Sequence, residues 1–291
     1  MSSEDLVTLR EPENQFTTTH HVYEPHRGGI PPVREYVREL WRRRQFANES
    51  SRANLRAANT LTLFGQLWMV LNPLLLAGVY YFVVTIIAGG AQGPTFFAHM
   101  TSGLFAFYFL QGAMSAGAGS VVGGGKLLLN TAFPRLLLPY SSLRTAWFRF
   151  LPTIPVYFIF HFIADAPLGW VTLLAIPFLA FLNIFAMGLA AFFATLQVYF
   201  RDTASFLPYI NRIWLYLSPV LWTMSDLPER FVPYAMLNPL YSILGGYREA
   251  LVDGVVPSAS TWIAAVLWSV CALVIGSLFF MSREREFAVR I

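Results

Sequence analysis

Long runs without charged residues alternate along the chain with short segments that carry charges, glycines or prolines. The longest run, 57–125, contains no Asp, Glu, Lys or Arg and is long enough for two membrane-spanning helices of about 20 residues each. Helix-breaking glycines and a proline at 89–94 place a turn between the two. The pattern predicts an all-α polytopic membrane protein with six transmembrane helices, at 61–88, 95–122, 146–164, 169–198, 205–223 and 260–281. The fifth is the weakest because Arg212 lies inside it.

The basic residues indicate how these helices are oriented, because cytoplasmic loops of membrane proteins carry an excess of Lys and Arg. With both termini in the cytoplasm, 18 of the 20 Lys and Arg residues fall on or near the cytoplasmic side, and only Arg230 and Arg248 fall outside. We therefore predict a multi-pass protein of the cytoplasmic membrane with both termini cytoplasmic. The transmembrane domain is expected at 59–282, with a cytoplasmic loop at 123–145 and a short cytoplasmic C-terminal tail at 283–291.

Two different segments precede the first span. Residues 1–30 have no apolar stretch, and despite a trio of histidines that a metal site could use, their polar composition favours a mobile cytoplasmic tail. Residues 31–58 have apolar and basic residues at three- and four-residue spacing, which is typical of an amphipathic helix. Such a helix just before a first span is expected to lie flat on the cytoplasmic membrane surface. The alternative is a soluble helix that packs against a partner protein.

The segment 224–251 is too apolar for a free loop and too interrupted for a span. Its interruptions fall at Pro233, at Asn238 and Pro239, and at Gly245 and Gly246. Two short apolar pieces separated in this way predict a re-entrant pair of helices near the outer face. Irregular backbone at membrane depth is tolerated only where protein buries it or where it lines a cavity. The segment is therefore a candidate gate, with an interfacial hairpin of no gating role as the alternative.

Composition excludes several classes of protein. The chain is 56% hydrophobic and 12% charged with a mean hydropathy of +0.52, whereas soluble domains carry roughly 25% charged residues. A soluble enzyme, a nucleic-acid-binding module and a disordered chain are therefore excluded. The net charge of +4 reflects topology rather than an anionic partner, and the single cysteine, Cys271, cannot form an internal disulfide.

No constellation of residues indicates catalysis or a cofactor in this chain. Polar residues at membrane depth are scattered over several spans, without paired carboxylates or a metal-ligand spacing. Three glycines followed by Lys126 resemble part of a phosphate-binding loop, but Ser120 and Leu127 stand where that motif needs a glycine and a Ser or Thr. We expect no catalytic, cofactor or metal residues, so any ATP energy must come from another subunit.

Several short strings, in order along 60–291, carry a resemblance to a known family. LFGQLWMVLNPL at 63–74 is similar to the G-x-L-W-x-x-L-N-P-L string, and FPRLLLP at 133–139 to the F-P-R-x-x-L-P loop, of ABC-2-type polysaccharide export permeases. Arg201 and Asp202, YLSPVL at 216–221, NPL at 238–240 and the end EFAVRI at 286–291 also resemble that family. Each match is weak alone, and their order and spacing relative to six spans make them strong together.

The resemblance implies a homodimer that exports a lipid-linked glycan, such as O-antigen, teichoic acid, capsule or cell-wall galactan. Two ATP-binding cassette subunits would bind on the cytoplasmic side and hold the ATP and Mg. The arginine- and aromatic-rich composition suggests the galactan exporter of actinobacterial cell envelopes. The family's functional elements would fall as follows: ATPase coupling at Lys126, Phe133, Pro134 and Arg135; the interface helix with Arg38, Trp41 and Arg42; the gate with Asn238, Pro239, Gly245 and Gly246.

Aromatic residues on the outer halves of the first two spans are candidates for the lining of a glycan channel. Rings pack against the C–H faces of sugars without deep binding minima, which suits a sliding polymer. The candidates are Tyr80, Tyr81, Phe105 and Tyr108, and ordinary helix packing is the alternative for each. Two rival functions remain at this point: an ABC-2 permease for small lipids or drugs, and a membrane enzyme that acts on a polyprenyl carrier.

Overall fold

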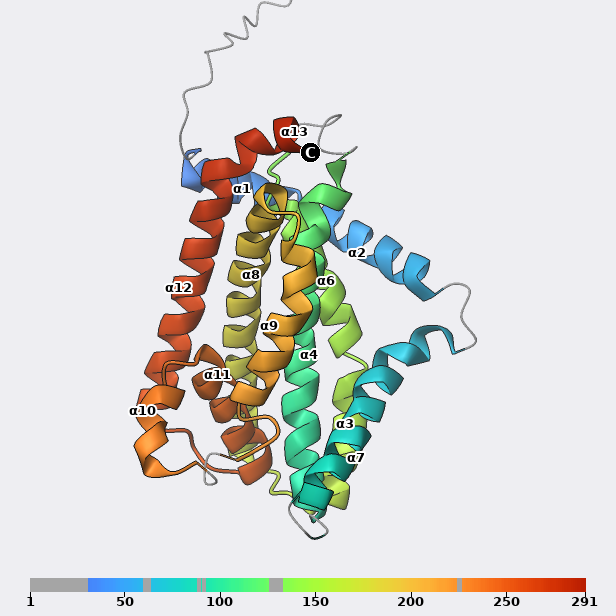
Figure 1. Ribbon diagram of the computed structural model, residues 1–291, viewed down its shortest axis with the longest axis vertical. Coiled ribbons are helices and arrows are strands. Elements are labelled where there is room, and N and C mark those ends of the chain that lie inside the picture. Colours follow the sequence, from blue (N-terminus) through green and yellow to red (C-terminus); the bar gives the residue numbers. More distant parts are fainter. Residues whose placement is uncertain (1–30, 60–63, 88–89, 91–92, 126–132, 224–226) are drawn as a thin grey trace, which may run out of the picture.

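The computed structural model describes residues 31–59, 64–87, 90, 93–125, 133–223 and 227–291, and among these it contains helices and turns but no strand. The long helices run along the long axis of the molecule (Figure 1). One end carries α1, the start of α6 and α13, and we call it the α1 end; the other carries α10, and we call it the α10 end.

The elements have the following bounds. The α-helices are α1 Val33–Arg42, α2 Arg44–Asn59, α3 Trp68–Ile87, α4 Pro94–Gly123, α6 Leu137–Phe150, α7 Thr153–Ile163, α8 Ala175–Tyr199, α9 Thr203–Leu217, α10 Val232–Ala235, α11 Pro239–Arg248, α12 Ala259–Arg283 and α13 Phe287–Arg290. The shorter turns are the 3-10 helices η1 Gly65–Leu67, η2 Trp170–Leu174, η4 Glu229–Phe231 and η6 Glu284–Glu286, and the π-helical turn η5 Glu249–Asp253.

Five helical segments of the described chain are long and apolar enough to cross a membrane: Trp68–Ile87, Pro94–Gly123, Leu137–Ile163, Trp170–Tyr199 and Ala259–Arg290. They overlap with the first four predicted spans and the sixth. At the place of the fifth predicted span, α9 lies beside α4 and α8 but has only 15 residues. The count of six spans therefore stays a prediction.

Three predicted boundaries differ from the structure. The segment predicted as one helix at 31–58 is two helices, because the chain leaves the helical path at Arg43. Within the segment predicted as a cytoplasmic loop at 123–145, α6 already begins at Leu137. Pro139 did not prevent this, because proline is tolerated in the first turn of a helix. The predicted C-terminal tail is helical and returns to the protein, where it buries Phe287.

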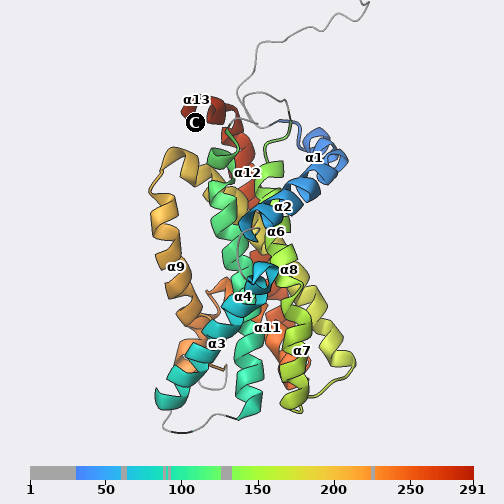
Figure 2. The same cartoon turned by 90° about the vertical axis from the view of Figure 1, so that its right-hand side faces the viewer.

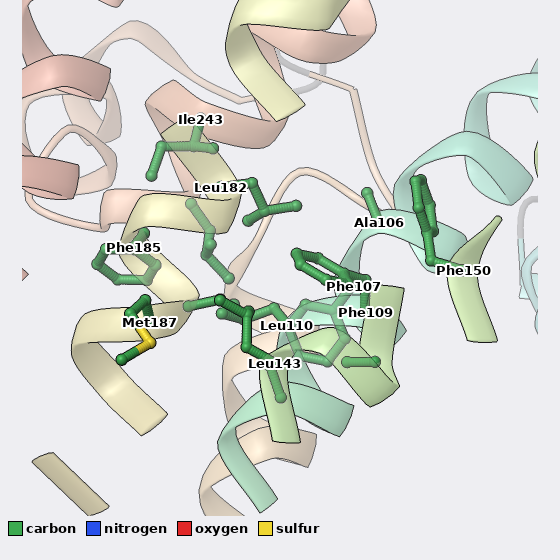
Figure 3. Packing of buried hydrophobic residues seen from close by; sticks show 14 of the residues in the cluster. Ala106, Phe107, Phe109, Leu110, Leu143, Phe150, Leu182, Phe185, Met187 and Ile243 are labelled. Atoms are coloured by element: carbon green, nitrogen blue, oxygen red, sulfur yellow. The ribbon is translucent and has the colours of Figure 1, made fainter. Parts of the chain in front are cut away.

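The core is centred on α8, which packs against α4, α12, α11 and α6. Figure 3 shows side chains from four of these helices meeting there, among them Phe107 and Leu110 of α4, Leu143 of α6, and Leu182 of α8. The contact between α8 and α12 is very close: a Cβ at Gly276 would lie 2.0 Å from the carbonyl oxygen of Gly188. Small residues allow membrane helices to approach this closely, and dispersion contacts then stabilise the pair.

In contrast, α3 is peripheral. It lies on the side of the bundle that faces the viewer in Figure 2, where it packs against α4. Among its described side chains, only that of Ala77 is buried. Its remaining surface is apolar with little charge, as is typical of a helix covered by lipid or by another subunit.

Candidate functional site

A hydrogen-bonded cluster at the α1 end joins three segments that are far apart in the sequence. The hydroxyl of Tyr36 on α1 donates to Oε2 of Glu284 at 2.6 Å, and the backbone N–H of Leu136 donates to the Tyr36 oxygen at 3.2 Å. Arg135 donates from Nη1 to the carbonyl oxygen of Glu284. Burial, together with the nearby Glu284 carboxylate, raises the pKa of Tyr36, so its hydroxyl stays neutral and able to donate. We call Tyr36, Arg135, Leu136 and Glu284 the end cluster.

The predicted coupling residues lie at or beside the end cluster. Pro134 is buried just before α6, and the ring of Phe133 lies 5.8 Å from the ring of Phe46 on α2. Arg135 points to Glu284 within the same chain, and Lys126 lies outside the described residues. The start of α6 is therefore connected to α1, α2 and η6 together.

The connection to α2 continues along α6. Arg144 donates from Nε to the side-chain oxygen of Asn48 at 2.9 Å, and the hydroxyl of Ser51 donates to the carbonyl oxygen of Ser141 at 2.7 Å. Ser51 is fully buried by this contact. Because both bonds are made to α2, a displacement of α6 along its axis would carry α2 with it.

The residues predicted for the interface helix lie on the outside of the molecule. Trp41 is 64% exposed, and it extends a line of exposed apolar side chains from Val33 through Val37. Arg38 and Arg42 are also exposed, and Arg42 makes a loose ion pair with Glu39 at 3.8 Å. The outward face of α1 is thus apolar beside a basic stripe, while Tyr36 holds its inner face.

The predicted gate segment is partly exposed and partly deep in the protein. Its first part, η4 and α10, is short and mostly exposed, whereas every residue of 240–248 in α11 is buried. A Cβ at Gly246 would lie 2.3 Å from the ring of Phe178, so Gly246 is a close-packing position, and the adjacent Gly245 is buried as well. The observed pair is therefore unequal: one four-residue turn of helix and one helix that is firmly packed.

Asn238 connects that segment to α9. Its side-chain oxygen accepts from the N–H of Leu240 at 3.1 Å, which caps α11 just before Pro239. The same oxygen accepts from the indole of Trp214 at 2.8 Å, and its amide donates to the carbonyl oxygen of Leu217 at 2.9 Å. Asn238, which was predicted as a gate residue at a break between two short helices, thus holds α9 and α11 together.

The predicted channel aromatics separate into three environments. Tyr80 of α3 packs edge-on against Tyr216 of α9 with ring centroids 6.4 Å apart, and Tyr108 of α4 lies near both tyrosines. Tyr81 packs instead against two phenylalanines at the start of α4, and Phe105 is buried between two cavities. The structure therefore brings together Tyr80 and Tyr108 and leaves Tyr81 and Phe105 in the packing.

Comparisons with known proteins identify relatives over most of the chain. The O-antigen export system permease protein RfbA of Klebsiella pneumoniae is 31% identical over 205 residues, which cover 69% of this chain and 78% of that protein. A protein of the same name from Myxococcus xanthus is 28% identical over 258 residues, 88% of this chain and 98% of that protein. The polysialic acid transport protein KpsM of Escherichia coli is 20% identical over 234 residues, 76% and 86% of the two chains. No family model matches the chain.

The first of these relatives decides the family, because it is matched at this identity over more than two thirds of its length. The chain belongs to the ABC-2-type polysaccharide export permeases. Permeases of this family are transport subunits and not enzymes. Among the described residues of this permease, no three His, Cys, Asp or Glu side chains are grouped to hold a metal ion.

Sequence reasoning about this permease missed two groupings of residues, although it had noted Arg212 and the string that begins at Tyr216 separately. Tyr36 and Glu284 are 248 positions apart, and no local pattern indicates that they meet. A second group lies on α9, where Tyr209, Arg212 and Tyr216 are all exposed. Their helical spacing can be read from the sequence, whereas their exposure is seen in the structure. That stripe was detectable, because a charge and two tyrosines on one face of a predicted span are unusual.

Proposed function

We propose that this permease is the transmembrane subunit of an ATP-driven exporter that moves polyprenyl-linked polysaccharide across the cytoplasmic membrane. The names of its relatives support a glycan substrate, since they concern O-antigen and polysialic acid. A homodimer with two ATP-binding cassette subunits, which would carry the ATP and Mg, is part of the proposal. The orientation with both termini cytoplasmic follows from the distribution of Lys and Arg and places the α1 end in the cytoplasm.

The observation that carries the proposal is the end cluster, in which α1, the start of α6 and η6 are bonded into one unit. ATP binding would close the ATPase pair and push on the loop before α6, around Phe133, Pro134 and Arg135. Because buried hydrogen bonds and ring contacts join that loop to α1 and α2, the push would move these elements as a rigid body. Rigid-body motion about an interface is a common mode of switching.

The stripe on α9 supports a channel between two copies of the chain. Arg212 is exposed in the middle of α9, and a charge at the bilayer centre costs roughly 2.5–3.5 kcal/mol. A second copy or a water-filled path would remove that cost. Tyr80, Tyr108 and Tyr216 beside it would offer rings and hydroxyls to a passing glycan. The gate role proposed for 224–251 then belongs to η4 and α10, since α11 is fixed in the core.

Two finer alternatives follow from the same fold. A permease for small lipids or drugs would have a similar bundle. An assay that compares how strongly a polyprenyl-linked glycan and amphiphilic drugs stimulate ATP hydrolysis would distinguish the two. Within the glycan proposal, a cell-wall galactan is one possible substrate beside O-antigen-like glycans, and the glycosyltransferase genes next to this one would distinguish them.

The coupling proposal is tested with the double variant Phe133→Ala, Arg135→Ala in the complex with its ATPase. We expect export of the glycan to fall about tenfold or more while ATP hydrolysis and membrane insertion remain, because the pushed surface is lost. Arg201→Ala is the matched control, since it removes an exposed arginine between α8 and α9. Normal export by the double variant would contradict the assignment of this loop to coupling.

A further inference from the structure

A cavity of about 350 Å³ lies between α3, α4 and α6. Its walls combine aromatic and aliphatic side chains, such as Phe105, Tyr108 and Phe109, with polar groups. The volume is near the lower limit of the roughly 300–1,000 Å³ of small-molecule sites. It therefore suits a compact group rather than a length of polysaccharide.

The polar side chains of this cavity include three that can donate hydrogen bonds and have no hydrogen-bond partner in the described part of the chain. They are the guanidinium of Arg149, the amide of Asn72 and the indole N–H of Trp68. Arg149 is also the one charged residue among those that line the cavity. Donors of this kind with one fixed positive charge favour an anion, and a guanidinium matches the oxygens of a phosphate in particular.

The position of the cavity fits a lipid headgroup. Trp68 is the first residue of α3, and Arg149 lies in the last turn of α6, after which the chain has no charge until Asp165. Trp68 therefore lies where α3 begins on the side of the α1 end, and Arg149 lies farther in, about midway along the segment Leu137–Ile163. An ionisable side chain at such a depth that faces a cavity is typical of a substrate path. Pro73 inside α3 also lines the cavity, and a proline there removes a backbone hydrogen bond and bends the helix. Since α3 is peripheral, the cavity lies close to the outer surface of the bundle.

We propose that this cavity binds the phosphate group at the head of the lipid carrier of the substrate. Arg149 pairs with the phosphate oxygens, Asn72 and Trp68 donate to them, and the prenyl chain extends past α3 into the bilayer. The proposal rests on the proposed function, which supplies a polyprenyl-linked substrate. It adds a loading site that recognises the carrier by its charge, independent of which glycan is attached.

The test measures binding of radiolabelled undecaprenyl phosphate to the purified full-length chain in phosphatidylcholine nanodiscs. We expect Arg149→Ala to weaken binding about tenfold, the usual effect of removing one charge-assisted contact, and Arg149→Lys to restore part of it. Arg201→Ala is the control and should bind as the wild type does. An unchanged affinity of Arg149→Ala would overturn the proposal.

A second pair of variants tests the cavity itself without touching a charge. Gly112 lines it, and a Cβ there would lie 3.8 Å from Cβ of Ala146, so Gly112→Ala fits without strain. Gly112→Leu would fill part of the cavity and should reduce binding by about tenfold, while Gly112→Ala should not. Equal binding by both variants would overturn the location.

Competitors distinguish the sources of the phosphate. Undecaprenol, which lacks the charge, and inorganic phosphate, which lacks the chain, should compete at least about tenfold less well than undecaprenyl phosphate. Equal competition by phosphatidylglycerol would show that Arg149 only meets bulk lipid headgroups, and would also overturn the proposal. Glycan export by the wild-type complex is measured separately, so a failure of export would contradict the proposed function without altering the binding result.

Discussion

Gly188 lies where α8 meets α12, and a Cβ at that position would be 2.2 Å from the carbonyl carbon of Ala272. The obstacle is backbone, so no side chain can rotate away. We expect Gly188→Ala to force the two helices apart and to lower the free energy of unfolding by about 1–3 kcal/mol. Thermal unfolding of the purified protein in detergent measures this as a lower midpoint.

Gly119→Ala is the matched control for that variant. Gly119 is a glycine inside α4, and a Cβ there meets nothing within 4 Å. Alanine has the higher helix propensity, so this change should leave the unfolding midpoint unchanged or raise it slightly. A midpoint for Gly188→Ala as high as that of Gly119→Ala would contradict the close contact between α8 and α12.

At the scale of the element, α1 presents Val33, Val37 and Trp41 outward, next to Arg38 and Arg42. A helix with this arrangement is expected to rest on the membrane surface, with its apolar side toward the acyl chains. To test this, an environment-sensitive fluorophore is attached to the cysteine of Trp41→Cys in a Cys271→Ser background. We expect a blue-shifted emission that nitroxide-labelled lipid quenches.

The same fluorophore at position 35, introduced as Glu35→Cys, serves as the control, because Glu35 is exposed on the same helix but is polar and outside the apolar line. Its emission should resemble that in water and should resist the lipid quencher. Identical behaviour of the two positions would show that α1 does not lie on the membrane and would favour a soluble partner.

Helix ends that lie next to glycine, proline or charged residues were predictable from the sequence. The start of α4 at Pro94 follows glycine, and α7 and α12 end at Ile163 and Arg283, next to charged residues, close to their predicted bounds. In contrast, the charge-free runs did not indicate the first turns of α6, because Arg144 interrupts the run there. Its guanidinium donates to the side chain of Asn48 on α2, which the sequence does not reveal. Partners this far away in sequence leave no local pattern, and the same reason hides Tyr36 and Glu284.

For the candidate site, the sequence indicated positions better than roles. Motif strings located Phe133, Arg135 and Asn238, and the structure places all three at contacts between elements. The sequence could not show that Arg135 donates a hydrogen bond to Glu284, or that Asn238 holds α9 to α11. Both contacts depend on how helices that are distant in the sequence pack together. Aromatic content likewise could not separate Tyr80 from Tyr81, which are adjacent but point to different neighbours.

At the scale of the whole molecule, the single chain leaves the α9 stripe of Tyr209, Arg212 and Tyr216 largely exposed, although Tyr216 contacts Tyr80 of α3. If two copies enclose a water-filled path along this stripe, a cysteine there is hydrated and ionises, and the thiolate reacts readily. We expect Arg212→Cys in the Cys271→Ser background to be modified by a membrane-impermeant thiosulfonate in proteoliposomes of the assembled exporter.

Ile275→Cys is the control in the same background, since Ile275 is an exposed apolar residue in the middle of α12 and is expected to face lipid. Its thiol should stay protonated in the hydrocarbon and react at least about tenfold more slowly. Modification at both positions would mean that exposure alone decides reactivity, and protection of position 212 would mean that protein or lipid covers the stripe. Either result would contradict the path between two copies, because that arrangement requires water at Arg212 and none at Ile275.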